Sequence, residues 1–199
     1  MTKLVFFDTE TTGLPSNDRI GALQHRSNWP DLVSICWMIF ENGTHIRTEN
    51  HIVRPEMYEI PPESTKIHGI TQRQAEQEGK PLSQVLSRFA DDVKDAAVLC
   101  AHNLHFDKNV LFHAFKWRLN KDPTRFWPVL AEFCSMKQAQ DELKLPAKYP
   151  TAKELYKRPR LAELYYAEFG EQMKNAHTAL GDVEALQRIF FARWDVHEE

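Results

Sequence analysis

Two acids stand one residue apart where an apolar stretch of the sequence ends. Residues 4–7 form an apolar run of the kind that makes a buried strand, and Asp8 and Glu10 follow directly. Since side chains on a strand alternate between its two faces, both carboxylates point to the same side. Two carboxylates beside a core repel each other and lose hydration, so they need a cation or a proton. A divalent metal ion meets that need; the alternative is that the strand ends early and water solvates both acids.

Two further acids fall on the core-facing side of predicted helices. In a helix expected over about 106–119, apolar residues stand three, four, seven and ten positions after Asp107, so Asp107 shares their face. In a helix expected over 178–193, Asp182 stands four residues before Leu186 and seven before Ile189, which again puts it on the buried side. Either acid alone could simply be a favourable charge in a first helical turn.

Together the four acids indicate a metal centre that performs hydrolysis. Four unpaired buried carboxylates are costly, and the sequence shows no Lys or Arg at matching buried positions. Ligands that are all oxygen suit Mg²⁺ or Mn²⁺, and two such ions about 3.5–4 Å apart clamp the attacking and leaving oxygens of a phosphodiester displacement. His177, five residues before Asp182, could take the proton from the attacking water as general base, although a lone His before a helix is usually a cap or a surface residue.

The elements that carry these residues follow a pattern typical of an α/β fold with a mixed sheet. Asn42-Gly43 signals a hairpin between an apolar strand over 32–40 and an edge strand over 45–54. We expect a long loop or flap with a short helix over 15–30, and a Pro-broken basic stretch over 143–160. The other strands are expected over 96–101 and 128–134, and the other helices over 64–68, after Thr71, and over 82–95, 135–142 and 161–169.

Composition narrows the class of protein. A chain of 199 residues with 42% apolar residues suits a single domain over 1–199 with a sizeable core. The net charge of −3 argues against a general nucleic-acid coat or a polybasic membrane surface, and leaves local basic patches open. Three scattered cysteines, Cys36, Cys100 and Cys134, are typical of buried thiols in a reducing compartment. With no signal segment and no apolar run long enough for a bilayer, we expect a soluble cytoplasmic protein without a membrane partner.

The motifs resemble those of the DEDDh 3′–5′ exonucleases. This DnaQ-like group of the ribonuclease H-like superfamily includes proofreading epsilon subunits, ribonuclease T, oligoribonuclease and TREX-type enzymes. Residues 7–14, 102–107 and 177–182 are similar to its three motifs, and the His-to-Asp spacing in the last is that of the "h" branch. Residues 67–71 are similar to the segment between the first two motifs, and the resemblance extends from Leu4 to about Phe190.

The resemblance implies a ribonuclease H-like fold, a five-stranded mixed sheet with helices on both sides. It implies that Asp8, Glu10, Asp107 and Asp182 hold two Mg²⁺ or Mn²⁺ ions and that His177 is the base. It also implies contacts to the 3′-terminal nucleotide, to its base and sugar, and to the penultimate region, from Thr11, Gly13, Leu14, His68, Ile70, Asn103 and Phe106.

We therefore expect a nucleic-acid-binding hydrolase, a metal-dependent 3′–5′ exonuclease that releases 5′-mononucleotides. Single-stranded DNA is the favoured substrate, because a pocket for an unpaired end suits stacking of bases on apolar side chains. An exoribonuclease remains the alternative, since no residue is a decisive reader of the 2′-OH. A non-catalytic interaction module and a metal-stabilised structural domain are alternatives of other classes. Because about 17 residues follow Asp182, we do not expect the long tail by which some proofreading subunits bind their polymerase, and a polymerase partner is possible but not indicated. The DNA or RNA preference, the physiological role, the oligomeric state and the roles of 15–30 and 143–160 stay open.

Overall fold

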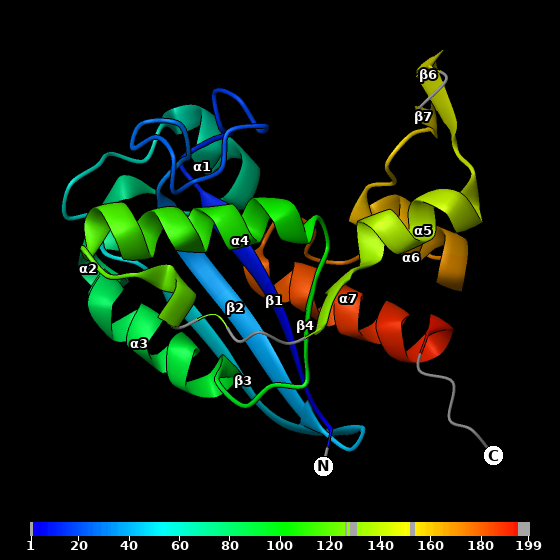
Figure 1. Ribbon diagram of the computed structural model, residues 1–199, viewed down its shortest axis with the longest axis horizontal. Coiled ribbons are helices and arrows are strands. Elements are labelled where there is room, and N and C mark those ends of the chain that lie inside the picture. The colour runs from blue at the N-terminus through cyan, green and yellow to red at the C-terminus, as the bar shows by residue number, and fades with distance from the viewer. Residues whose placement is uncertain (1, 126, 128–130, 152–153, 195–199) are drawn as a thin grey trace.

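A five-stranded mixed sheet lies at the centre of the structure, a computed structural model that describes residues 2–125, 127, 131–151 and 154–194 (Figure 1). The strand order is β3-β2-β1-β4-β5. Strand β1 (Lys3–Thr11) pairs antiparallel with β2 (Leu32–Glu41), which pairs antiparallel with β3 (Thr44–Ile52) at the edge. On its other side β1 pairs in parallel with β4 (Val98–Ala101), and β4 with β5 (Ala131–Cys134). This is the α/β, ribonuclease H-like arrangement that the sequence predicts.

Helices cover both faces of this sheet (Figure 1). As expected, Gly69 ends the helix over 62–68 in the left-handed conformation. The Thr71 hydroxyl caps the helix over 72–78, also as expected, by accepting a hydrogen bond from the Gln74 N–H at 3.1 Å. The described helices are α1 (Pro62–His68), α2 (Gln72–Glu78), α3 (Leu82–Val93), α4 (Leu104–His113) with a π-helical continuation (Ala114–Arg118), a 3₁₀ turn (Pro123–Arg125), α5 (Ser135–Leu143), α6 (Leu161–Phe169) and α7 (Ala179–Arg193).

Alternation along β1 divides the core into two layers. Val5 and Phe7 are fully buried among residues of α3 and α4, whereas Leu4 and Phe6 pack against α7. Asp8 and Glu10 are in phase with Leu4 and Phe6, so they leave the strand on the α7 side. Thr9 is in phase with Phe7 and faces α4.

Two segments differ from the expectation. For 15–30 the expected long loop is confirmed and the short helix is wrong: the segment forms turns, and side chains of α4 and its continuation donate hydrogen bonds to its backbone carbonyls. Within 143–160, strands β6 (Pro146–Thr151) and β7 (Glu154–Tyr156) pair as a small hairpin that projects beside α5 and α6 (Figure 1), which the Pro-rich sequence did not indicate. Residues 128–130 of the fifth expected strand and Lys153 of the basic stretch lie outside the described residues.

The three cysteines are free thiols; Cys36 and Cys100 are buried and Cys134 is half-buried. None of the described helices combines the length and the hydropathy needed to cross a membrane.

Candidate active site

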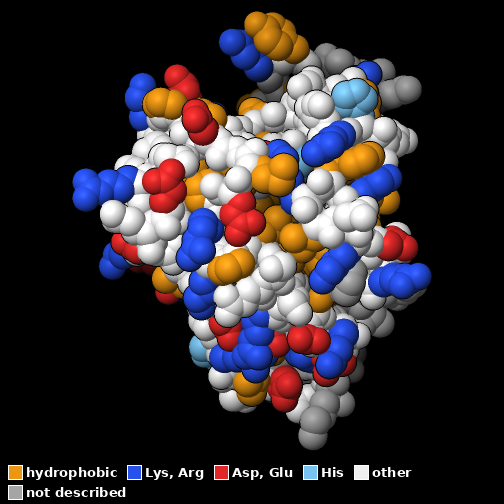
Figure 2. All heavy atoms as spheres, turned by 90° about the vertical axis from the view of Figure 1, so that its left-hand side faces the viewer, with side chains coloured by type: hydrophobic (Ala, Val, Ile, Leu, Met, Phe, Trp, Pro, Cys, Tyr) orange, Lys and Arg blue, Asp and Glu red, His pale blue; other side chains and the backbone are white. Residues whose placement is uncertain are grey.

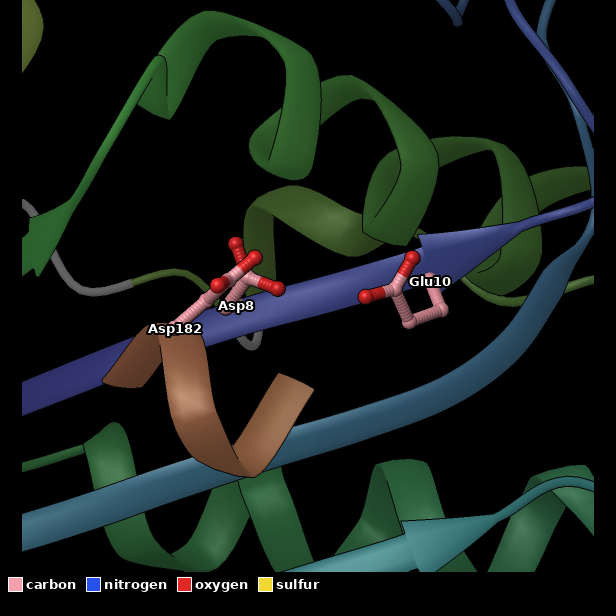
Figure 3. A group of neighbouring side chains, drawn as sticks. All are labelled: Asp8, Glu10 and Asp182. Atoms are coloured by element: carbon pink, nitrogen blue, oxygen red, sulfur yellow. The ribbon is translucent and has the colours of Figure 1, made fainter. Parts of the chain in front are cut away.

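Asp8, Glu10 and Asp182 bring carboxylates from two elements to one place (Figure 3). Asp8 and Glu10 come from β1, and Asp182 comes from the first turn of α7. Each of the three half-buried side chains offers one carboxylate oxygen, and these oxygens all lie within 4.8 Å of one another. In Figure 3 the carboxylates of Asp8 and Asp182 point toward one another, and Glu10 lies further along the strand.

The start of α7 is held in position by its own cap and by a close backbone approach. The Thr178 hydroxyl accepts a hydrogen bond from the Gly181 N–H at 3.1 Å. A Cβ atom on Gly181 would stand 2.2 Å from the carbonyl oxygen of Asn175, so the loop before α7 reaches a position that a side chain at 181 would occupy. This loop carries His177.

Asp107 of α4 is 2% exposed and is held by Thr9. Its Oδ1 accepts hydrogen bonds from the Thr9 N–H at 3.1 Å and from the Thr9 hydroxyl at 2.7 Å. The pairing between β1 and β4 ends at Phe6 of β1. At Thr9, the Asp107 carboxylate therefore accepts the hydrogen bond that a carbonyl of a longer β4 would accept. Asp107 lines the same cavity, of about 250 Å³, as the other three acids, although it stands outside their closest group.

Burial raises the pKa of every acid in this cluster, and repulsion from neighbouring acids adds to the rise at Asp8, Glu10 and Asp107. Burial raises the pKa of Asp8 well above its usual range, and the charges of Asp107, Asp182 and Glu10 add to the effect. The pKa of Glu10 rises to about 8 through burial and the charges of Asp182 and Asp107. Burial raises the pKa of Asp107 to about 7 against the opposing bonds from Thr9, and that of Asp182 to about 6 against a bond from the backbone of His177. Four carboxylates whose ionisation is suppressed in this way form a set of oxygen donors that fits a hard divalent cation.

His177 lies at the mouth of this cavity. Its side chain is exposed, and its backbone is in the left-handed region at φ +64°. The His177 N–H donates a hydrogen bond to Asp182 Oδ1 at 3.3 Å. The backbone therefore ties His177 to one of the four acids and leaves its imidazole open to solvent.

The residues predicted to contact substrate divide into two groups. Leu14, which is 83% exposed, Asn103 and Phe106 line the cavity with the acids. The structure does not bring the other four to the cavity lining. The Thr11 hydroxyl donates to the Gly13 carbonyl at 2.7 Å, while His68 is buried in α1 and accepts a hydrogen bond from the Ile70 N–H at 3.1 Å.

His102 lines the cavity, and we did not predict a role for it from the sequence. Its Nε2 lies 3.0 Å from the Pro159 carbonyl and must donate to it, so its Nδ1 accepts from the Ser135 hydroxyl at 2.9 Å. Burial lowers the pKa of His102 to about 4, which keeps the ring neutral in this arrangement. His102 and Thr9 both stand inside the sequence motifs, which was the available signal for them.

Comparison with known proteins gives one family and many structures. The family model of an exonuclease, RNase T, matches residues 5–190. Escherichia coli exonuclease I in complex with a dT13 oligonucleotide aligns with a TM-score of 0.71 and 19% identity, over 97% of this chain and 41% of that one. The zinc-bound E. coli complex with single-stranded DNA gives 0.72 and 20%, over 98% and 41%. A moderately thermophilic exonuclease I from Methylocaldum szegediense gives 0.73 and 18%, over 98% and 42%.

The present chain thus spans about two fifths of the length of these exonuclease I structures. At such low identity the likeness shows a shared fold. No curated protein sequence matches the chain.

Proposed function

Because this chain belongs to the RNase T family of exonucleases, the DEDDh group of the ribonuclease H-like superfamily, we propose that it removes 5′-mononucleotides from 3′ ends, with single-stranded DNA as its favoured substrate. The family makes it a nuclease that depends on divalent metal ions. The 3′–5′ polarity, the preferred strand, the number of ions and the residue roles are the proposal, as is its action as one domain over 1–199.

The observation that carries this proposal is the convergence of Asp8, Glu10, Asp107 and Asp182 on one cavity. Their oxygen atoms would hold two Mg²⁺ or Mn²⁺ ions, which when bound supply Lewis-acid stabilisation of the oxygens that attack and leave in a phosphodiester displacement. Thr9 orients Asp107 for this task through its two hydrogen bonds.

His177 would act as the general base that takes a proton from the attacking water. Its imidazole is exposed at the cavity mouth, while its backbone is fixed to Asp182. A base needs this combination, because it must reach the reacting water and release its proton to solvent afterwards. Its φ of +64° is the kind of local strain that functional sites retain.

Leu14, Asn103 and Phe106 would contact the terminal nucleotides, because they line the cavity beside the acids. Apolar side chains at this place suit stacking on an unpaired base. The resemblance also implies that Thr11 and Gly13 would touch the terminal nucleotide and that His68 and Ile70 would line its base and sugar. The exonuclease I structures with dT13 and dA16 bind single-stranded DNA, which favours DNA for this chain as well; an exoribonuclease is the alternative.

Matched DNA and RNA oligonucleotides, labelled at the 3′ or at the 5′ end, test the proposal. With Mg²⁺ or Mn²⁺, mass analysis should show 5′-mononucleotides released stepwise from the 3′ end of DNA, faster than from RNA. Asp8→Asn should show no release. Faster release from RNA would make RNA, and not DNA, the favoured substrate. Release from the 5′ end would overturn the proposed 3′–5′ polarity. A wild-type chain inert with every divalent ion would favour the non-catalytic interaction module.

A further inference from the structure

A second and larger groove adjoins the cavity of the four acids. Its volume is about 640 Å³, against about 250 Å³ for the acidic cavity. Leu14, Asn103 and Phe106 line both, so the two hollows are continuous along these three residues. A strand whose end lies among the acids must continue past these residues.

The lining of this groove suits a nucleic-acid strand. Arg19, Lys137 and Arg158 contribute three cations, and Asp18 is the acid among the lining residues. Positive charge gathers here although the chain as a whole carries a net charge of −3. By contrast, basic and acidic side chains are interspersed on the face that carries α2 and α3 (Figure 2). Cations beside an apolar surface are the combination that single-stranded nucleic acid binds, with phosphates on the charges and bases on the apolar side chains.

The wall formed by residues 14–19 is fixed by contacts from other segments. His105 of α4 donates from Nε2 to the Asp18 carbonyl at 3.1 Å. The Asn28 side chain accepts from the Asn17 N–H at 3.0 Å, and its amide group donates to the Asn17 carbonyl at 2.8 Å. Trp29, which also lines the groove, is 4% exposed and packs against the ring of Phe106 at a centroid distance of 5.9 Å, which holds the apolar surface in place.

A second part of the groove lining is held by His102. Its two ring nitrogens bind Ser135, the first residue of α5, and the carbonyl of Pro159. Lys137 stands two residues after Ser135, and Arg158 directly precedes Pro159. One half-buried imidazole therefore joins two segments, more than 20 residues apart in the sequence, that each carry a cation of the groove.

We propose that this groove binds the nucleotides immediately 5′ of the terminal one, with phosphates at Arg19, Lys137 and Arg158. The inference rests on the proposed function and deepens it: the substrate is a 3′ end with a single-stranded segment several nucleotides long. A dinucleotide, which is too short to extend along this groove, should be a poor substrate. Residues 15–19, within the segment whose role the sequence left open, are part of the binding surface.

The test is a length series read at several salt concentrations. For the wild type, kcat/KM should rise ~10-fold or more from dT2 to dT10, since one base stacked on an aromatic side chain is worth a factor of that order. Charge removal in Lys137→Met and in Arg19→Met should each reduce the slope of log(kcat/KM) for dT10 against log[salt] by about 0.7, the value for one phosphate contact on a single strand. Exposed Arg73 of α2 is outside the groove, and Arg73→Met should leave the slope unchanged.

Equilibrium binding of fluorescein-labelled dT10, with Ca²⁺ in place of Mg²⁺, gives a readout that needs no turnover. The affinity of the two groove variants should fall and lose salt dependence relative to Arg73→Met. Equal kcat/KM for dT2 and dT10, or equal salt slopes in all three variants, would overturn the proposal that the groove binds substrate. Hydrolysis of dT2 would in that case still support the proposed exonuclease activity. A chain that cuts no substrate but shows the altered salt slopes in binding would overturn the proposed function and support the groove.

Discussion

Asp107 Oδ1 accepts both hydrogen bonds that Thr9 can donate, from its backbone nitrogen at 3.1 Å and from its hydroxyl at 2.7 Å. Thr9 stands between Asp8 and Glu10 but points to the opposite face of β1. One strand residue therefore fixes the acid of α4 in register with the two acids of the strand. The site is assembled across the sheet edge rather than on one face of it.

Thr9→Val should weaken the use of metal. The change keeps the size and the backbone N–H of this buried residue and removes the hydroxyl bond to Asp107. Loss of a partner that orients a metal ligand typically costs about 10–100-fold in metal affinity or activity. The measurement is the Mg²⁺ concentration that gives half-maximal exonuclease rate, with Thr9→Ser as the control that keeps the hydroxyl. An unchanged Mg²⁺ dependence in Thr9→Val would show that the Thr9 hydroxyl does not affect metal binding.

Asp8→Asn should abolish activity and stabilise the metal-free chain. Loss of one ligand removes several kcal/mol of transition-state stabilisation, on the order of a thousandfold in rate or more. Without metal, however, the change removes a half-buried acid whose pKa is raised by desolvation and by three neighbouring acids. The melting temperature in chelator should therefore rise, and the stabilisation by added Mg²⁺ should shrink. A lower melting temperature in chelator would show that Asp8 has another favourable partner.

The metal-free chain should lose stability as the pH rises. The folded-state pKa values of Glu10, Asp107 and Asp182 are about 8, 7 and 6, all above the ordinary range of carboxylates. Between about pH 4 and pH 8 the unfolded chain has released protons that the folded chain still binds, so stability falls across this window. Thermal unfolding in chelator should give a melting temperature several degrees lower at pH 8 than at pH 5, at roughly 2–4 °C per kcal/mol.

Saturating Mg²⁺ should remove most of this pH dependence, because the ion takes the place of the protons. A flat melting temperature in chelator across the same window would contradict the raised pKa values.

His177→Gln should lower kcat without changing the Mg²⁺ dependence. The backbone N–H that bonds to Asp182 is retained, and the group that would accept a proton is lost. General-base catalysis is worth about 10²–10⁴-fold. Rates at saturating substrate, measured over a Mg²⁺ titration, separate the two effects. A variant with wild-type kcat would show that His177 is not the general base.

Gly181→Ala should destabilise the chain and displace the His177 loop. The new Cβ would meet the Asn175 carbonyl oxygen at 2.2 Å, so the backbone must move, at a cost of about 1–3 kcal/mol. Gly21→Ala is the matched control, because its nearest contact is at 3.9 Å. Thermal unfolding of both variants, with the exonuclease rate of each, makes the comparison. Equal melting temperatures would mean that the loop yields without cost.

Local periodicity was enough to predict the four acids and the strands that frame them. Asp8 and Glu10 follow from alternation along one strand, and Asp107 and Asp182 from helical spacing, because each pattern involves only a few neighbouring residues. The bonds that complete the site join distant residues: Thr9 binds Asp107 across 98 positions and His102 binds Pro159 across 57. Nothing in a single sequence marks such pairs.

The two errors of prediction, over 15–30 and over 143–160, have the same physical cause. The turns of 15–30 are stabilised by Lys116 Nζ and Trp117 Nε1, which donate to the carbonyls of Leu23 and Ala22 at 2.7 Å. Strands β6 and β7 lie in a stretch where prolines suggest a loop, and the end of β7 is tied to α5 by Gln140, which donates to the Tyr156 carbonyl at 2.7 Å. In both cases tertiary partners decide a local structure that propensity alone misassigns.

Beyond the end of the β1–β4 pairing, the Thr9 amide donates to the Asp107 carboxylate and not to a strand carbonyl. This amide can therefore report the charge state of Asp107. In a sheet that amide would bond to a neutral carbonyl; here its acceptor changes charge with pH and with metal occupancy. Its hydrogen-exchange rate and its ¹H chemical shift should follow the state of Asp107 while neighbouring β1 amides stay constant. A single backbone resonance would thus read the charge of the site in the intact chain, with no substrate present.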